Sequence, residues 1–173
     1  MNDQFAKNFP SALVTLSKIR KVKNDINTVL LHMENSPTKD IELLTLALGW
    51  KLFEYLIFIG AVNRQNILQL AAATQLLAFK FLNQFDSAIK VKDYVSQLTK
   101  IDKKGILKSK DIIEAEMYAF VLCRFSLCIK LEYLEDQFNA FLRINELELR
   151  EYLGDESYVV YIKEREESDL DES

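Results

Sequence analysis

The stretch LAAATQLLAFKFLN, residues 70–83, decides the fold class. Its middle is apolar or small nearly all the way round a helix, and a helix without a polar face is buried on all sides. Three consecutive alanines, residues 71–73, let neighbouring helices approach closely. We therefore expect this helix at the centre of a bundle. Lys80 falls in its last turns, where the helix would emerge and a cation would offset the C-terminal dipole.

The composition also favours a helical domain. The chain has 173 residues and a hydrophobic fraction of 49%, which is enough for one domain with a substantial core. It contains only 4 glycines and 2 prolines, and a sheet would need more turn residues than that. The net charge of −4 argues against a general nucleic-acid binder, because such proteins rely on cationic contacts to phosphate. We expect an all-α protein.

Apolar residues at steps of three and four, together with breaking residues, mark the expected helices. Ser36 and Ser109 are candidate N-caps, and Gly60 is a candidate helix end. The segment YVVYI, residues 158–162, fits either a strand or an apolar plug on the bundle. The expected helices cover residues 11–33, 38–59, 63–83, 91–101, 109–127 and 131–144.

The chain divides into four parts by composition. Residues 1–10 form a lead-in, residues 11–145 the helical domain, and residues 146–162 a segment that packs on it. Residues 163–173 are acidic and polar, which is typical of a disordered tail.

Three features predict a soluble protein of the cytoplasm, the nucleus or both. The N-terminal residues MNDQFAKNFP lack the apolar core of a signal peptide. The longest apolar run, LFEYLIFIGAV, contains Glu54 and is too short to span a bilayer. Cys123 and Cys128 lie five apart in an apolar segment, which favours buried, reduced thiols over a disulfide.

The sequence contains little that points to catalysis. His32 has neither a cysteine nor a carboxylate at ligand spacing, so a structural role is the better interpretation. Glu114 and Glu116 are two apart on a helix, where their side chains point in different directions. Common nucleotide-binding, zinc-protease and serine-hydrolase motifs are absent. We expect no enzymatic activity, no cofactor, no metal and no small-molecule substrate.

Two further groups of residues have ordinary structural interpretations. Met33, Met117 and the phenylalanines fall at helical spacing, so we expect them in the core. The basic cluster between Lys18 and Lys23 is expected to be a solvated helix face, because the apolar stripe occupies the other side.

A bundle of five helices, of which the third is alanine-rich and buried, resembles the cyclin box. LAAATQLLAFKF is similar to the third cyclin helix, including the lysine that ends it. EAEMYAFVLCRFSL is similar to the fifth, where a glutamate is followed nine positions later by an aromatic residue, here Glu116 and Phe125. The chain resembles the Cables family of single-box proteins more specifically. FPSALVTLSKIRKVKNDI and NRQNILQLAAATQLLAFK carry that resemblance, which covers about residues 5–145.

The resemblance implies binding to a cyclin-dependent kinase and regulation of the cell cycle or related signalling. In cyclins the two residues that match Lys80 and Glu116 hold the regulatory helix of the kinase through its backbone. Positioning that helix controls kinase activity. The alternative is that both are ordinary solvated charges. Apolar residues near the end of the third helix would flank the contact: Phe79 or Phe81, Leu82 and Phe85.

The chain departs from the cyclin pattern in ways that limit this inference. It lacks the MRxIL-type stretch, so docking of substrate peptides there is in doubt. Only 45 residues follow Cys128, which is too few for a second box. A protein with one box could bind a kinase without activating it, and would then act as an adaptor or a competitor. The long N-terminal region of Cables proteins has no counterpart here, and the link to Abl-type kinases does not carry over.

Other functions remain open at this stage. The chain is also compatible with a helical scaffold that uses the same fold for a partner other than a kinase. An exposed apolar patch beside Lys80 and Glu116 would favour kinase binding. A basic concave face would favour nucleic-acid binding, and a deep polar pocket would favour an enzyme. The motif SPTK, residues 36–39, additionally makes Ser36 a candidate site for a proline-directed kinase.

Overall fold

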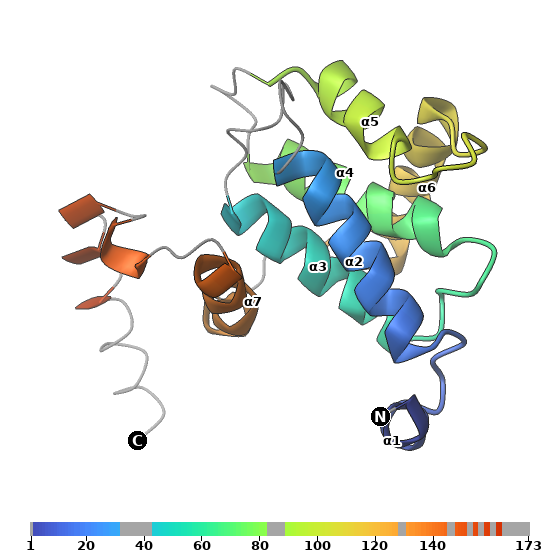
Figure 1. Ribbon diagram of the computed structural model, residues 1–173, viewed down its shortest axis with the longest axis horizontal. Helices are drawn as coiled ribbons and strands as arrows, with labels where there is room; N and C mark the ends of the chain where they lie inside the picture. Colours follow the sequence, from blue (N-terminus) through green and yellow to red (C-terminus); the bar gives the residue numbers. More distant parts are fainter. Residues whose placement is uncertain are drawn as a thin grey trace. The chain divides into compact units, whose positions relative to one another are not determined.

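The computed structural model describes residues 2–31, 43–82, 89–127 and 131–144, with residues 148–151, 154–155, 158–159 and 162–163 further on (Figure 1). All regular secondary structure in these ranges is helical, which confirms the all-α class. The chain falls into two compact units, Met1–Leu134 and Glu135–Ser173. The helices are α1 (Asn2–Asn8), α2 (Leu16–Leu31), α3 (Leu43–Phe58), α4 (Ile67–Leu82), α5 (Val91–Thr99), α6 (Ser109–Leu122) and α7 (Leu131–Ile144).

Helix α4 is the centre of the first unit. Every residue from Leu70 to Phe79 is buried, as the apolar sequence predicts. Helices α2, α3, α5 and α6 all pack against it. A helix in this position needs apolar or small residues all round, because each face meets another helix instead of water.

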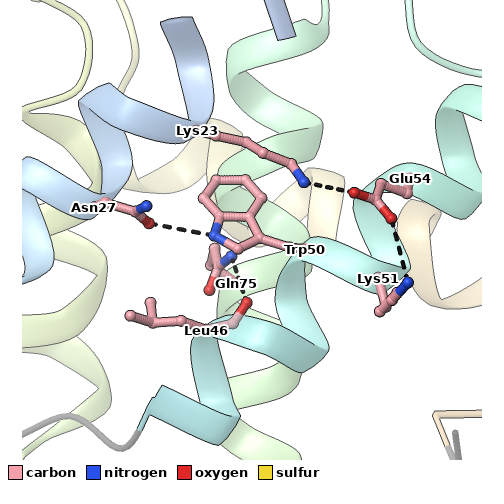
Figure 2. Close-up of polar contacts among 7 residues, drawn as sticks. All are labelled: Lys23, Asn27, Leu46, Trp50, Lys51, Glu54 and Gln75. Atoms are coloured by element: carbon pink, nitrogen blue, oxygen red, sulfur yellow. Dashed lines mark hydrogen bonds and ion pairs between the residues drawn. The ribbon is translucent and has the colours of Figure 1, made fainter. Parts of the chain in front are cut away.

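Helix α3 is almost as deeply buried, which the sequence analysis did not single out. Gly49 faces the side chain of Gln75 on α4, and a Cβ at position 49 would lie 2.5 Å from the Gln75 amide carbon. The Gln75 amide is fully buried, and its Nε2 donates a hydrogen bond to the carbonyl of Leu46 at 3.4 Å (Figure 2). The absence of a side chain at Gly49 therefore lets a buried glutamine cross between the two helices.

Gly60 ends α3 as predicted. Its φ of 75° is left-handed, a conformation that suits glycine. The amide of Ala61 donates to the carbonyl of Leu56, and the amide of Gly60 donates to that of Ile57, both at 3.0 Å. These are the two hydrogen bonds of a Schellman cap.

Three local expectations turn out differently. Ser109 is the first residue of α6 instead of its cap; Lys108 precedes it, and the Lys108 amide donates to the Asp111 carboxylate at 2.8 Å. Tyr158 and Val159 are helical, so the strand interpretation of YVVYI is wrong. Residues 2–8 of the expected lead-in form α1. The candidate cap at Ser36 and the expected tail, residues 163–173 apart from Lys163, lie outside the described residues.

Candidate functional site

Lys80 and Glu116 form an ion pair between the last turn of α4 and the middle of α6. The Lys80 Nζ lies 2.7 Å from the Glu116 Oε2. The side chain of Lys80 is 42% exposed and that of Glu116 is 12% exposed. The lysine that interrupts the apolar sequence of α4 thus reaches the surface and meets a largely buried carboxylate.

An exposed apolar stripe runs along α6 beside this pair. Its helical members are four residues apart and therefore share a face: Ile113, Met117 and Val121, with exposed fractions of 52%, 64% and 48%. Glu116 is three residues after Ile113 and adjoins the same face. Phe125, which is 64% exposed, follows at the same spacing just beyond the helix. We call these four apolar residues the α6 stripe.

The end of α6 is held in an unusual backbone conformation. Arg124 and Phe125 both have left-handed φ angles, 56° and 59°, which non-glycine residues adopt at some cost. The amide of Phe125 donates to the carbonyl of Phe120 at 3.0 Å, and the two rings meet edge to face with centroids 5.2 Å apart. Strain of this kind gathers at functional positions, and here it presents Phe125 to solvent.

The structure separates the apolar candidates near the end of α4. Phe79 is 2% exposed and stacks on Tyr94 of α5 with ring centroids 4.2 Å apart, so it is a core residue and cannot contact a partner there. Phe81 is 37% exposed, and Leu82 is half-buried. Phe85, Ser36 and His32 lie outside the described residues.

Two expectations about side chains on α6 have opposite outcomes. Met117 was expected in the core, but it lies on the outer face because α4 packs against the other side of α6. Glu114 and Glu116 do point in different directions, since Glu114 faces solvent and pairs with Lys110 at 3.5 Å. Sequence alone did not predict this stripe, because Ile113, Met117 and Val121 recur with the same helical spacing that a buried face would have.

The described residues offer little for chemistry at this face. Cys123 is buried, and that burial raises the pKa of its thiol, which favours the unreactive protonated form. Among the described ranges, no group of three histidine, cysteine or acidic side chains is placed to hold a metal ion.

A second group of polar residues joins α2 to α3, as Figure 2 shows. The Lys23 Nζ lies 2.6 Å from the Glu54 Oε1 and 5.3 Å from the centre of the Trp50 ring. The indole of Trp50 donates to the Asn27 Oδ1 at 3.2 Å, and Lys51 approaches Glu54 at 3.8 Å. Burial, only partly offset by Glu54, lowers the pKa of Lys23.

This second group corrects the expectation of a fully solvated basic face on α2. Lys18 and Lys21 are exposed as expected, but the side chain of Lys23 is only 18% exposed. The sequence carried an indication, because Lys23 lies four residues after Ile19 and three before Ile26, inside the buried stripe.

Comparison with known proteins finds relatives for most of the chain. Human CDK5 and ABL1 enzyme substrate 1 is 32% identical over 127 residues, which are 73% of this chain and 19% of the relative. Mouse CDK5 and ABL1 enzyme substrate 2 is 28% identical over 127 residues, 73% of this chain and 25% of the relative. The chain thus spans about a fifth to a quarter of the length of these proteins.

Other comparisons give no match. Neither a protein-family model nor a solved structure matches the chain. Within the described part of the chain, none of the helices has the length and apolar character needed to cross a bilayer.

Proposed function

The chain is a homologue of the Cables proteins, CDK5 and ABL1 enzyme substrates 1 and 2, and on this basis we propose that it binds a cyclin-dependent kinase through Lys80, Glu116 and the α6 stripe. The names of these relatives point to a kinase-related role. In this proposal the chain folds as a cyclin box, works in the cytoplasm or the nucleus, regulates the kinase, and has no catalytic activity of its own.

The observation that carries the proposal is the exposed apolar stripe beside the ion pair. Contiguous apolar surface next to a few polar groups is typical of a protein interface. The stripe would supply the buried area, with Met117 and Phe125 as the most exposed contacts. Lys80 and Glu116 would supply orientation, because a charged group that meets backbone hydrogen-bonding groups of a partner fixes its register.

The ion pair also prepares the site for a partner. Glu116 holds Lys80 at the edge of the stripe in the free chain, which lowers the conformational entropy that Lys80 loses on binding. An ammonium group has three donors, so hydrogens beyond the one directed at Glu116 remain for a partner's backbone carbonyls. Phe81, rather than the buried Phe79, would add a flanking contact.

Calorimetric titration of the full chain with a panel of purified cyclin-dependent kinases tests this proposal. For the kinase that binds, we expect Lys80→Ala/Glu116→Ala and Met117→Glu each to raise the Kd at least about tenfold, or about 1.4 kcal/mol. The matched control is Lys110→Ala/Glu114→Ala, which removes a more exposed ion pair from the same helix. Circular dichroism of every variant checks that it folds.

The results separate kinase binding from the scaffold alternative. Absence of binding to every kinase in the panel would reject kinase binding and favour a scaffold with a different protein partner. Binding that Lys80→Ala/Glu116→Ala and Met117→Glu both retain would place the kinase on another face.

A second proposal concerns Ser36 in the motif SPTK. The relatives are named as substrates of a cyclin-dependent kinase, and a serine followed by proline and a nearby lysine is the pattern of such kinases. We propose that this chain is phosphorylated at Ser36. Purified kinase and labelled ATP should modify the chain but not Ser36→Ala, and equal labelling of the two would refute the assignment.

A further inference from the structure

The thioether of Met117 lies in the middle of the α6 stripe and faces solvent. Met117 is 64% exposed, and Ile113 and Val121, four residues before and after it, share its face of the helix. Ala119, two residues further along, is fully buried on the other face, which packs against the bundle. The sulfur of Met117 is therefore held at the surface by the same packing that buries Ala119.

Met117 differs in its chemistry from the rest of the α6 stripe. The other three side chains, those of Ile113, Val121 and Phe125, are hydrocarbons that resist mild oxidants. A thioether sulfur reacts with peroxides through its lone pair and becomes a sulfoxide. The stripe thus contains one atom that a mild oxidant modifies, at its centre.

The nearby thiol of Cys123 is protected from the same oxidants. Cys123 is 6% exposed, and burial raises the pKa of its thiol. Oxidation of cysteine proceeds through an accessible thiolate, which this position disfavours. Met117 and Cys123 are the sulfur-containing residues that the structure describes. Within these ranges, a peroxide therefore reacts at Met117 first.

We propose that Met117 is a reversible redox modification site, at which oxidation to the sulfoxide releases a partner from the α6 stripe. This inference rests on the proposed binding of a kinase to the stripe. The oxidant is hydrogen peroxide: the sulfur attacks one peroxide oxygen, the S–O bond forms as the O–O bond breaks, and the other oxygen leaves as water. Two thiols of a sulfoxide reductase reverse the step, becoming a disulfide while the oxygen leaves as water.

The sulfoxide changes what a partner has to cover. Its oxygen is polar and hydrogen-bonds to water in the free chain. A partner that covers the stripe must remove that water, and the hydrocarbon side chains around Met117 offer no donor in its place. Binding is weakened for this reason. Conversely, a bound partner buries the sulfur and disfavours its oxidation, because the two effects are linked.

The fold should survive this modification. The buried residues of α6 are Ile112 and Ala119, with Cys123 just after the helix. A sulfoxide inside a core disrupts packing, whereas a sulfoxide at Met117 meets water. We therefore expect the melting temperature to be unchanged by oxidation, which separates a regulatory modification from oxidative damage.

Peptide mass spectrometry of the full chain tests the modification itself. The chain is treated with hydrogen peroxide, which is then removed by desalting. We expect a sulfoxide at Met117, formed at a rate comparable to that of free N-acetylmethionine, and no oxidation of Cys123 in the same time. Treatment with a thiol and the two methionine sulfoxide reductases, one for each epimer, should restore the original mass.

Calorimetry with the kinase that binds the chain measures the effect on the interface, and each protein is compared with itself before and after peroxide. Oxidised wild type should have a Kd at least about tenfold higher than untreated wild type, and the reductases should reverse the change. Met117→Leu has an apolar side chain of similar volume without sulfur, so peroxide should not alter its Kd. The matched control, Met33→Leu, should respond to peroxide as wild type does.

Hydrophobic-interaction chromatography gives a readout that needs no kinase. Oxidised wild type should elute earlier than untreated wild type, because a polar group then interrupts the exposed apolar stripe. Met117→Leu should elute at the same position before and after peroxide. Thermal melting of each sample checks that it remains folded.

Four results would overturn the inference. They are no sulfoxide at Met117, a sulfoxide that the reductases leave in place, a lowered melting temperature after oxidation, and oxidised wild type that binds the kinase as tightly as before. If neither form binds any kinase, the proposed function fails by itself, and chromatography decides on the modification. An elution shift that Met117→Leu abolishes would then support it, and a shift that this variant retains would refute it.

Discussion

Gln75 shows how one residue determines the packing of two helices. Its amide is buried between α3 and α4, where it occupies the space that a side chain at position 49 would fill. The hydrogen bond to the Leu46 carbonyl satisfies one of its donors, and among the described atoms its Oε1 has no partner. Buried polar groups of this kind restrict the ways in which two apolar helices can slide past each other.

Gly49→Ala is expected to destabilise the fold by about 1–3 kcal/mol, because the new Cβ would lie 2.5 Å from the Gln75 side chain in a site without free space. Urea unfolding of the single and double variants measures this effect. In a Gln75→Ala background the same change should cost less than about 0.5 kcal/mol, since the obstructing amide is gone. Equal costs in the two backgrounds would show that the clash is not the cause.

Polar contacts join helix α2 to helix α3, and the shortest of them is an ion pair. Lys23 and Glu54 are 31 residues apart in sequence and 2.6 Å apart in space. Lys23 also covers the Trp50 ring, whose indole bonds to Asn27 (Figure 2). Three separate interactions thus fix one face of α2.

Glu54→Gln should destabilise the protein by about 1–2 kcal/mol at pH 7, because it leaves the Lys23 ammonium buried without its carboxylate. The partial exposure of Glu54 keeps the cost below that of a fully buried pair. The double variant Lys23→Met/Glu54→Gln should recover most of the loss in denaturant unfolding. A double variant as unstable as Glu54→Gln would mean that Glu54 acts through other contacts.

The same lysine predicts a dependence of stability on pH. Burial lowers the pKa of Lys23 in the folded chain below its ordinary value of 10.5, so the unfolded chain binds the proton more tightly. The free energy of unfolding should therefore rise with pH as the pH approaches 10.5 from below. As the pH rises over this range, the free energy of unfolding of wild type should increase relative to that of Lys23→Met. A constant difference between the two would contradict the lowered pKa.

At the scale of the whole molecule, most of the buried apolar residues belong to the first compact unit, Met1–Leu134. Helix α4 contacts α2, α3, α5 and α6, and all of these lie within that unit (Figure 1). The proposed kinase-binding face lies there as well. The first unit therefore carries both the central helix and the residues proposed to bind a kinase.

A fragment of residues 1–134 is expected to fold on its own, because it retains α4 together with α2, α3, α5 and α6, which pack on it. Its circular dichroism should be helical, and its urea unfolding should be a single cooperative transition with an m value of about 1–3 kcal/mol/M. A fragment that unfolds gradually, without such a transition, would show that residues 135–173 are needed to complete the core.

The sequence by itself determined helices α2 to α7 and the position of α4 at the centre, but not the short helix α1. Both follow from local physics: apolar residues recur with the helical period, an all-apolar helix needs cover on every side, and Gly60 accepts a left-handed φ. The resemblance to cyclins also selected Lys80 and Glu116 together, and the structure brings them to 2.7 Å.

Only the tertiary structure decided which apolar residues face outward. Phe79 and Phe81 are two residues apart, so they point to opposite sides of α4, and an apolar helix gives no sign of which side remains open. Met117 has the same composition and spacing as a core residue and is exposed because α4 covers the other face of α6. The Lys23–Glu54 pair likewise joins residues that are 31 positions apart in the chain. Such contacts depend on how the helices pack, which no local pattern contains.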